Sequence, residues 1–543
     1  MVVATTETPK QILDGFVRKP SVQSEQYRAA NLWSNLPLWQ ILHQGVERYS
    51  DSIAVTDNHT SLSYLELANR VDRIAAGLRE EGLVCGDSVV LQLANTLDFL
   101  VVFFALQRLG VVPVLALPAH GLVEIRHFIQ LSDAKVYIGT NHEKDGKALA
   151  IATQLQSELS VSIRCYISGY FGQFSTLPEG DADDFTPAMV DPEHPALFLV
   201  SGGTTGLPKL IPRTHNDYLF NVKQCAKASE ISAQDVYLAV LPAAHNFTLG
   251  CPGILGILNA GGKVVLTTNP SPDYCFGLIE KQHITSTALV PALAQLWTEA
   301  TQWESTDRSS LRLIQVGGSK LAYSDALKMQ NAFPNALQQV FGMAEGLIAC
   351  TRLGDDKEII ATRQGCPVSE WDEVLVVDAQ GKPVAVGEEG ELLTRGPYTL
   401  GGYYRAPEYN LRAFTDEGYY RSGDRVVVDS QGYFTVTGRI KDVIIRAGEN
   451  IAADELEELL LSHPQIAQVA VFPLPDAHLG EKIAVAAVIR GSGLMLRDIR
   501  QFLQTKEIAA FKLPDELFVV KSLPKTAVGK IDKKRILSTM VPR

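Results

Sequence analysis

A series of short, almost wholly apolar runs, alternating with amphipathic helical patterns, constrains the fold of this chain more than any other feature. The runs occupy residues 87–93, 111–117, 235–241 and 263–268. Strands that are apolar on both faces are typical of sheets covered by helices on both sides, and helices between successive strands favour parallel pairing. We therefore expect an α/β fold whose large N-terminal domain holds helix-covered, mainly parallel sheets.

The pattern changes after Trp371. Short strands then follow one another between glycine-rich turns, at residues 373–377, 390–396, 425–429 and 433–439. Closely spaced strands of this kind pair in an antiparallel manner. We expect them to form a small antiparallel, barrel-like unit that completes the N-terminal domain.

A second domain is expected after residue 440. A chain of 543 residues is too long for a single core. Beyond Lys441 the sequence has a compact α+β pattern, with helices at 453–462 and 496–506 and strands at 466–474 and 482–490. The sequence predicts one domain at residues 1–440 and a small α+β domain at residues 441–543.

Composition excludes several classes of function. The formal net charge of −12 argues against a nucleic-acid-binding protein. The most apolar stretch, residues 99–118, contains Gln107, Arg108 and Gly110, so it predicts a buried helix followed by a buried strand rather than a membrane span. The seven cysteines include no CxxC pair, and the first residues lack the features of a secretory signal. We expect a cytoplasmic protein with neither membrane nor nucleic acid as partner.

A glycine-rich loop, SGGTTGLPKLIPRTH at residues 201–215, follows an apolar strand at 196–201. Its glycines let the main chain approach a ligand closely, and its hydroxyl and ammonium groups suit phosphate oxygens. It is not a Walker loop, because no Gly-Lys pair in the chain is followed by Ser or Thr. The loop predicts a polyphosphate site formed by Ser201, Gly202, Gly203, Thr204, Thr205, Gly206 and Lys209.

The segment QQVFGMAEGL, residues 338–347, adds a second element of such a site. Phe341 offers an aromatic plane for stacking on a base. Glu345 is a carboxylate in an apolar stretch, where burial without a cation would be costly. Mg²⁺ prefers oxygen ligands, so Glu345 is the candidate metal ligand.

In this order, the two segments resemble motifs of the adenylate-forming superfamily, which includes acyl-CoA synthetases, peptide-synthetase adenylation domains and firefly luciferase. The resemblance covers nearly the whole chain. It implies binding of ATP and Mg²⁺, with Glu345 on the metal, Asp424 of GYYRSGD at the ribose and Arg439 of TGRIKD as a further nucleotide contact. The remaining nucleotide-binding residues that it implies are Gly317, Gly318, Gln339, Val340, Phe341, Gly342, Met343, Ala344 and Val436.

The resemblance identifies Lys530, in LPKTAVGKIDKK, as the adenylation lysine. A cation that touches both the attacking carboxylate and the α-phosphate would offset the repulsion between these two anions. Lys530 belongs to the small domain, and members of the superfamily rotate this domain between the two half-reactions. The resemblance gives Lys441 the hinge position and puts Gly448 in the thioester-forming pose.

The segment LPAAHNFTLGCPG, residues 241–253, resembles aryl acid–AMP ligases that serve siderophore assembly. The resemblance implies that His245 contacts the carboxylate end, that Asn246 binds an ortho hydroxyl, and that Phe247 packs on the ring. The other acid-pocket residues would be Cys251, Gly318, Ser319, Val340 and Ile348. Related dihydroxybenzoate ligases carry serine at the position of Cys251 and valine at that of Ile348. Because cysteine is a poor partner for a 3-hydroxyl, we expect salicylate to be preferred over 2,3-dihydroxybenzoate, although Ser319 keeps the second acid open.

Three alternatives remain at this stage. The acyl acceptor is expected to be the phosphopantetheine arm of an aryl carrier protein, but an aromatic acid–CoA ligase would share the first step. A luciferase-like oxygenase also begins with an adenylate, although no cofactor motif accompanies it. A catalytically dead binding module is disfavoured by the presence of Lys209, Glu345, Asp424, Arg439 and Lys530.

Overall fold

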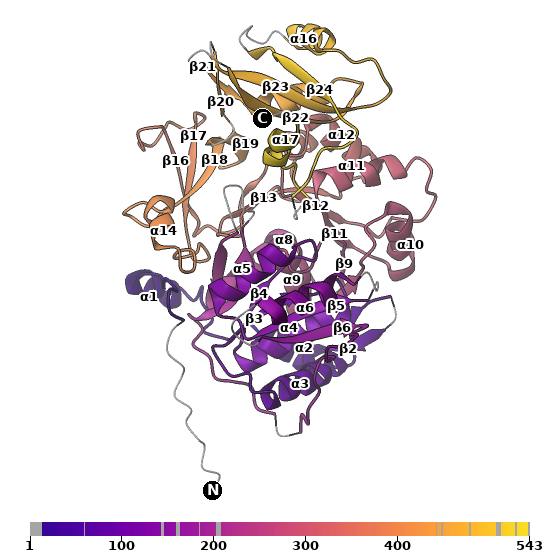
Figure 1. Ribbon diagram of the computed structural model, residues 1–543, viewed down its shortest axis with the longest axis vertical. Helices are drawn as coiled ribbons and strands as arrows, with labels where there is room; N and C mark the ends of the chain where they lie inside the picture. Colours follow the sequence, from indigo (N-terminus) through magenta and orange to yellow (C-terminus); the bar gives the residue numbers. More distant parts are fainter. Residues whose placement is uncertain are drawn as a thin grey trace.

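The computed structural model describes residues 13–540, except residues 59, 143–145, 159–162, 184, 202–207, 441–442, 447–448, 477–478, 507–511 and 527–528. Two β-sheets covered by helices form most of the large N-terminal part (Figure 1). All four apolar runs named above are strands, and residues 99–118 hold a helix and a strand as predicted. The expected α/β fold class is therefore confirmed.

The larger sheet has nine strands in the order β15-β14-β13-β12-β11-β9-β10-β1-β2. Pairing is parallel from β13 to β1 and antiparallel at both edges. The strands are β1 (Ile53–Thr56), β2 (Ser61–Ser63), β9 (Val236–Ala239), β10 (Lys263–Leu266), β11 (Ser286–Leu289), β12 (Leu313–Gly317), β13 (Leu337–Gly342), β14 (Ile348–Cys350) and β15 (Cys366–Pro367).

The second sheet has six strands in the order β6-β5-β3-β4-β7-β8, all parallel except β8, which pairs antiparallel with β7. The strands are β3 (Ser88–Gln92), β4 (Val112–Leu115), β5 (Val136–Asn141), β6 (Arg164–Gly169), β7 (Pro195–Val200) and β8 (Leu210–Thr214). The glycine-rich loop therefore joins an antiparallel pair of strands.

The helices of this part include some that are buried on nearly every side. Helix α4 has eleven buried residues, as its almost unbroken apolar sequence requires. One buried cluster joins residues of both sheets with residues of α3, α4, α7 and α9, so these helices pack between the sheets. The helices are α1 (Ser21–Ala29), α2 (Gln40–Tyr49), α3 (Tyr64–Glu80), α4 (Leu97–Leu109), α5 (Leu122–Ser132), α6 (Lys147–Glu158), α7 (His215–Ala228), α8 (Asn246–Gly250), α9 (Gly253–Ala260), α10 (Pro272–Gln282), α11 (Pro291–Ala300), α12 (Tyr323–Ala332), α13 (Lys357–Thr362) and α14 (Pro407–Ala413).

The expected antiparallel unit is a four-stranded meander of β16 (Glu373–Val377), β17 (Glu389–Arg395), β18 (Tyr420–Val428) and β19 (Phe434–Arg439). Its strands pair in sequence order, and the described residues of β16 and β19 do not pair with each other. The unit is therefore an open sheet rather than a barrel, since four strands are too few to close around a core.

The C-terminal part has its own five-stranded sheet and its own buried clusters. Strands β22 and β23 pair antiparallel over most of their length, and β24 adds to β23 in parallel. The elements are β20 (Val443–Arg446), β21 (Glu449–Ala452), α15 (Ala453–Leu461), β22 (Ile466–Asp476), β23 (Gly480–Ile489), α16 (Leu496–Gln504), β24 (Glu516–Val519) and α17 (Lys533–Met540).

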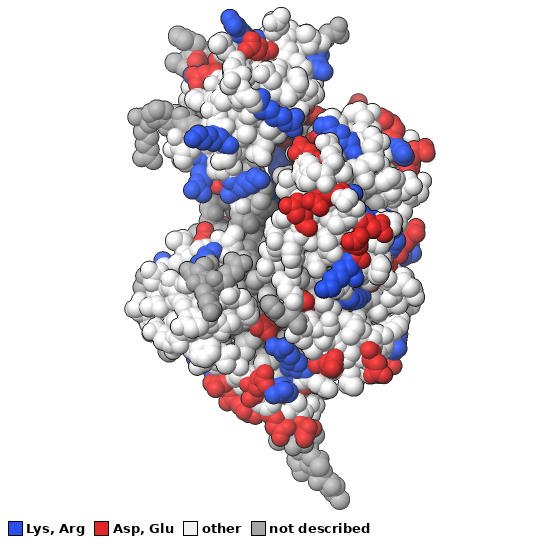
Figure 2. Space-filling model, turned by 90° about the vertical axis from the view of Figure 1, so that its right-hand side faces the viewer, with Lys and Arg blue, Asp and Glu red and all other residues white. Residues whose placement is uncertain are grey.

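Ion pairs connect the C-terminal part to the large part. Lys320, just after β12, lies 2.9 Å from Glu458 of α15, and Arg490 lies 3.8 Å from Glu299 of α11. Within the described chain, no buried apolar cluster includes residues of both parts. Charged side chains of both signs lie near the junction on the face seen in Figure 2. Exposed pairs of this kind contribute little free energy.

None of the described helices combines the length and the apolar character needed to cross a bilayer. The longest apolar helix, α4, is a helix of the interior.

The carboxyl of Asp372 is buried where the large sheets meet the meander, and burial raises its pKa to about 7. The hydroxyl of Tyr398 donates to Asp372 Oδ2 at 2.7 Å and accepts the main-chain N–H of Ile348 at 3.2 Å. The folded chain therefore holds the Asp372 proton more tightly than the unfolded chain, for which the ordinary value is 3.8. The contribution of this group to the free energy of unfolding is fully present below pH 3.8 and is lost as the pH rises through about 7.

We expect Asp372→Asn to remove this part of the pH dependence, which amounts to at most about 1.4 kcal/mol per pH unit. Denaturant midpoints of the wild-type protein and the variant, compared at about pH 5 and about pH 7.5, measure it. An equal change of midpoint in both proteins would contradict the expectation.

Candidate active site

The two ends of the glycine-rich loop are fastened to each other. Ser201 N–H donates to the Lys209 carbonyl at 2.9 Å, and Lys209 N–H donates to Ser201 Oγ at 2.8 Å. The ammonium of Lys209 lies 3.9 Å from the ring centre of Tyr409, a cation–π contact. The predicted phosphate-binding residues Gly202, Gly203, Thr204, Thr205 and Gly206 lie outside the described residues.

Glu345 lies in the turn between β13 and β14, and both its main chain and its side chain accept hydrogen bonds. Its carbonyl accepts the N–H of Leu400 at 2.7 Å, and its carboxylate Oε1 accepts the hydroxyl of Tyr403 at 2.7 Å. Gly346 packs against the same loop, since an added Cβ would lie 2.8 Å from Thr399 Cα. The carboxylate is therefore fixed in direction by residues more than fifty positions further along the chain.

A buried arginine behind this turn connects the two large sheets. Arg213 of β8 is fully buried, and its Nε donates to Asp217 Oδ1 at 2.8 Å. Its Nη1 donates to the carbonyl of Ala344 at 3.0 Å. Arg213 therefore links the edge of the six-stranded sheet to the turn that carries Glu345 in the nine-stranded sheet.

Asp424 and Arg439 face each other across β18 and β19, with Arg439 Nε 3.0 Å from Asp424 Oδ1. Burial raises the pKa of Asp424, and the positive charges of Arg439 and Lys530 oppose that rise. Lys530 comes from the C-terminal part, and the residue as a whole is exposed. Its ammonium end is partly desolvated by the surrounding protein, which lowers its pKa, as does the charge of Arg439. The charges of Asp424 and Glu345 raise the pKa of Lys530. The chain thus gathers two carboxylates and two cations from three separate segments.

Several predicted nucleotide-binding residues pack together beside this group. Phe341, Met343 and Val436 belong to one small apolar cluster, and the Phe341 ring meets Phe434 edge-on at 6.0 Å between centres. Gly342 is exposed at the end of β13.

Gln339 differs from these neighbours. Its amide Nε2 donates to the carbonyl of Ile360 at 2.6 Å, and its main-chain N–H and carbonyl are both hydrogen-bonded to Thr351. Its groups therefore already have partners on the side of α13, away from the residues around Glu345.

The predicted acid-pocket residues converge near the carboxyl ends of β12 and β13. Asn246 Oδ1 accepts the hydroxyl of Tyr218 at 2.9 Å, and its Nδ2 lies 3.4 Å from Cys251 Sγ. Gly317 is the close-approach point, since an added Cβ would lie 2.7 Å from the Val340 carbonyl and 3.1 Å from Phe247 Cζ. Asn246, Phe247, Cys251, Val340 and Ile348 are all buried, whereas Gly318 and Ser319 are exposed in the loop after β12.

His245 is neutral in this arrangement. Burial, together with the positive charge of Lys530, lowers its pKa to about 4. Its Nδ1 accepts the N–H of Phe247 at 3.2 Å, capping α8, so the ring proton is on Nε2 by inference from that bond. His245 can therefore donate one hydrogen bond to an anion without carrying charge.

Three residues around the site were not singled out from the sequence: Arg213, Tyr218 and Tyr403. Arg213 had a detectable signal, because a charged residue in the apolar strand Leu210–Thr214 requires a buried partner. The two tyrosines had none, since nothing local shows which carboxylate or amide their hydroxyls meet.

Two family models define the class of protein to which this fold belongs. Residues 42–404 match the family model of the AMP-binding enzymes, and residues 455–530 match that of the AMP-binding enzyme C-terminal domain. The chain belongs to this family of adenylate-forming enzymes.

The chain is similar along nearly its whole length to ligases of aryl acids. It is 46% identical over 538 residues, 98% of this chain and 95% of the relative, to the salicyl-AMP ligase / salicyl-S-ArCP synthetase of Mycobacterium tuberculosis. It is 45% identical over 526 residues, 96% of this chain and 97% of the relative, to the vibriobactin-specific 2,3-dihydroxybenzoate-AMP ligase of Vibrio cholerae. Among solved structures, the apo structure of Mycobacterium smegmatis MbtA matches with a TM-score of 0.75 and 45% identity, covering 97% of this chain and 100% of that one.

The Arg213–Asp217 pair leads to a stability prediction. We expect Arg213→Met to lower the free energy of unfolding by about 3–5 kcal/mol, because Asp217 remains as a buried charge that has lost its ion-pair partner. The double variant Arg213→Met/Asp217→Asn should recover more than half of this loss. Urea unfolding of the wild-type protein, both single variants and the double variant measures the coupling, and strict additivity of the single effects would contradict it.

Proposed function

We propose that this enzyme uses ATP to convert an aryl acid into its aryl-AMP with release of pyrophosphate. It then transfers the aryl group to the phosphopantetheine thiol of an aryl carrier protein, in siderophore or related natural-product biosynthesis. Salicylate is the favoured acid and 2,3-dihydroxybenzoate the next. The names of the two aryl acid ligases described above support the substrate class.

The observation that carries the proposal is the position of Lys530. Its charge acts on Glu345, Asp424 and His245, which come from the large part. In adenylation, a carboxylate oxygen attacks the α-phosphorus of ATP while the bond to the β-phosphate oxygen breaks. A cation at this point offsets the repulsion between the two anions and stabilises the charge that develops. Neutral His245 can donate Nε2–H to the acid carboxylate without attracting it away from the lysine.

Glu345 is the proposed ligand of Mg²⁺. Among the described residues, no group of three metal-type side chains surrounds it. A single carboxylate fits Mg²⁺ in a nucleotide site, where phosphate oxygens and water complete the coordination. The bound ion would neutralise charge on the phosphates. The protein's own contribution is to fix the carboxylate, through Tyr403 and Leu400.

The remaining nucleotide contacts are proposed on the same pattern. Asp424 would accept the ribose hydroxyls while Arg439 holds it in place, and Phe341 would stack on the base. Lys209 would bind the outer phosphates together with the loop at residues 202–206. Gly317 and Gly318 would approach the adenine through the main chain.

The acid ring is proposed to pack on Phe247, whose own ring lies against Gly317 at the strand ends. Because Tyr218 takes the oxygen of the Asn246 amide, Asn246 would offer N–H to the ortho hydroxyl oxygen. Cys251 lies beside Asn246 and gives a 3-hydroxyl only a weak partner. This combination supports salicylate as the preferred acid.

The transfer step is proposed to need a different pose of the C-terminal domain, which we take as residues 441–543, after the domain at residues 1–440. Lys441 as hinge and Gly448 in the thiolation pose remain predictions that lie outside the described residues. The few exposed ion pairs at the junction support a separable domain. Comparing holo-aryl carrier protein with CoA as acceptor, by release of AMP, tests the choice of thiol.

We expect Lys530→Ala to lower ATP–pyrophosphate exchange by about a hundredfold or more, because the cation at the reacting centre is lost. Transfer of the acyl group from supplied aryl-AMP should remain within a few-fold of the wild-type rate. Exchange and single-turnover transfer assays measure the two steps separately. Equal loss of both steps would contradict the assignment.

For the acid, we expect kcat/KM to favour salicylate over 2,3-dihydroxybenzoate. Cys251→Ser should shift the ratio towards dihydroxybenzoate by about fivefold or more, since an unpaired buried hydroxyl costs about 1–3 kcal/mol. ATP–pyrophosphate exchange with benzoate, salicylate and dihydroxybenzoate provides the values. A tenfold preference of the wild-type enzyme for dihydroxybenzoate would overturn the choice of acid.

A further inference from the structure

The segment of residues 13–20, here called the N-terminal strap, crosses the loop of residues 396–401. The ammonium of Lys19 donates to the carbonyl of Gly396 at 3.0 Å and to the carbonyl of Thr399. Slightly further along the chain, Trp33 Nε1 donates to the carbonyl of Pro397 at 3.2 Å. Three main-chain carbonyls of the loop thus accept hydrogen bonds from residues near the start of the chain.

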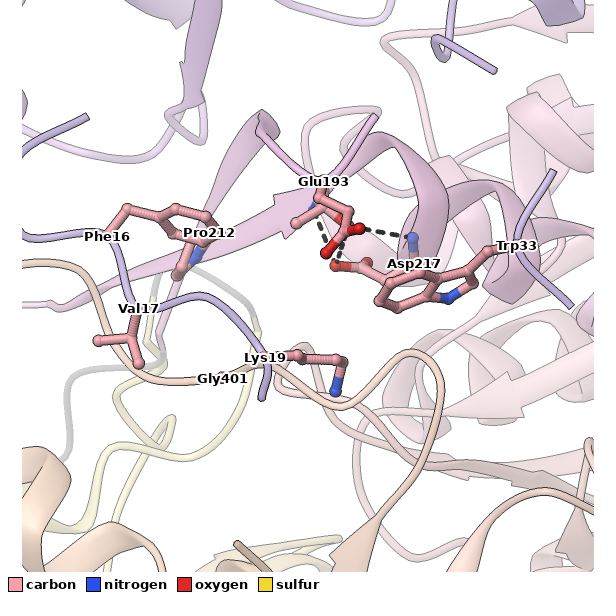
Figure 3. Close-up of a pocket in the computed structure, with 9 residues that line it drawn as sticks. Phe16, Val17, Lys19, Trp33, Glu193, Pro212, Asp217 and Gly401 are labelled. Carbon is pink, nitrogen blue, oxygen red and sulfur yellow. Dashed lines mark hydrogen bonds between the residues drawn. The ribbon is translucent and has the colours of Figure 1, made fainter. Parts of the chain in front are cut away.

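The contact between strap and loop is tight. An added Cβ on Gly401 would lie 2.6 Å from the carbonyl oxygen of Val17. Lys19 lies beside Gly401, with Trp33 and Asp217 near it, in Figure 3. The cavity among these residues measures about 10 Å³, room for about one water molecule, so it is not a ligand site. Lys19 therefore acts on its protein surroundings.

The opposite side of the same loop holds Glu345. Leu400 N–H donates to the Glu345 carbonyl at 2.7 Å, Gly346 packs on Thr399, and Tyr403 follows two residues after the strap contact at Gly401. The loop thus contacts both Lys19 and the turn that carries the proposed metal carboxylate. A shift of the loop would move the carbonyl and the carboxylate of Glu345 together.

Lys19 is a costly residue at this position. Burial lowers its pKa to about 8; Asp217 opposes this, and Arg213 and Arg395 add to it. Among the described residues, no carboxylate lies at ion-pair distance from its ammonium, which is held by two carbonyls and by the more distant charge of Asp217. A neutral side chain would avoid this cost, which is why a role beyond filling space is indicated.

We propose that Lys19 is a positioning residue for Glu345: by fixing the carbonyls of Gly396 and Thr399, it sets the place of the loop that orients the metal-binding carboxylate. This inference rests on the proposed function, because it takes Glu345 as the Mg²⁺ ligand. It assigns Lys19, though not the rest of the strap, to the active-site framework.

The test is the Mg²⁺ dependence of ATP–pyrophosphate exchange with salicylate. We expect Lys19→Met to raise the Mg²⁺ concentration for half-maximal rate about fivefold or more and to lower kcat, with KM for salicylate unchanged, because the metal carboxylate is displaced while the acid pocket is not. Lys19→Arg, which keeps the charge and the donors, should recover part of the shift. The matched control is Arg18→Met, which removes the neighbouring exposed ion pair with Asp191 and should leave the Mg²⁺ dependence unchanged.

A folded Lys19→Met enzyme with the wild-type Mg²⁺ dependence would overturn the inference, as would an equal shift in Arg18→Met. Should Lys19→Met fail to fold, Lys19→Gln decides the matter, because its shorter, neutral side chain cannot hold the carbonyls of Gly396 and Thr399 as the ammonium does. A raised Mg²⁺ requirement in this variant supports the inference, and an unchanged one overturns it. Absence of Mg²⁺-dependent exchange in the wild-type enzyme with every aryl acid would instead refute the proposed function.

Discussion

The buried ion pair between Arg213 and Asp217 is the interaction on which the geometry of the site depends. Arg213 stands at the edge of the six-stranded sheet, and its second hydrogen bond goes to the carbonyl before Glu345 in the nine-stranded sheet. A buried ion pair is strongly destabilising to break, because either partner left alone is an uncompensated buried charge. The pair therefore fastens β8, which follows the glycine-rich loop, to the turn that carries Glu345.

Around this fixed point the chain assembles groups that differ in how firmly they are held. Glu345 is tied through its carbonyl and its carboxylate, and Asp424 is tied to Arg439. Lys530 belongs to a part that has buried clusters of its own, and the ion pairs of this part with the rest, such as Lys320–Glu458, are exposed. Strength of attachment thus follows the proposed role of each group. The groups proposed to hold the nucleotide are tied by hydrogen bonds and an ion pair within the large part, whereas the lysine proposed for adenylation comes from the C-terminal part.

Much of the fold could be predicted from the sequence because the signals are local. Apolar runs such as residues 87–93 require burial on both faces, and residues 99–118 give a helix and a strand once Gly110 ends the helix. The neighbourhood of Glu345 could be predicted because its motif is contiguous. Three features could not. The meander is an open sheet, since closure depends on strand number and tilt rather than on alternation. Gln339 is directed towards α13, a choice made by Ile360 and Thr351. Lys19 contacts a residue 380 positions away, and a lone lysine carries no local pattern that would show it.

The contacts at the two ends of the chain bear on how the protein is made. Lys19 is hydrogen-bonded to the loop that contacts the turn carrying Glu345. The negative charge of Glu345 also interacts with Lys530, which lies thirteen residues before the last one. During synthesis from the N-terminus, the strap therefore has no loop to bind until about three quarters of the residues have been added, and Lys530 follows later still. A chain that stops before Lys530 would lack the cation on which the proposed adenylation step depends.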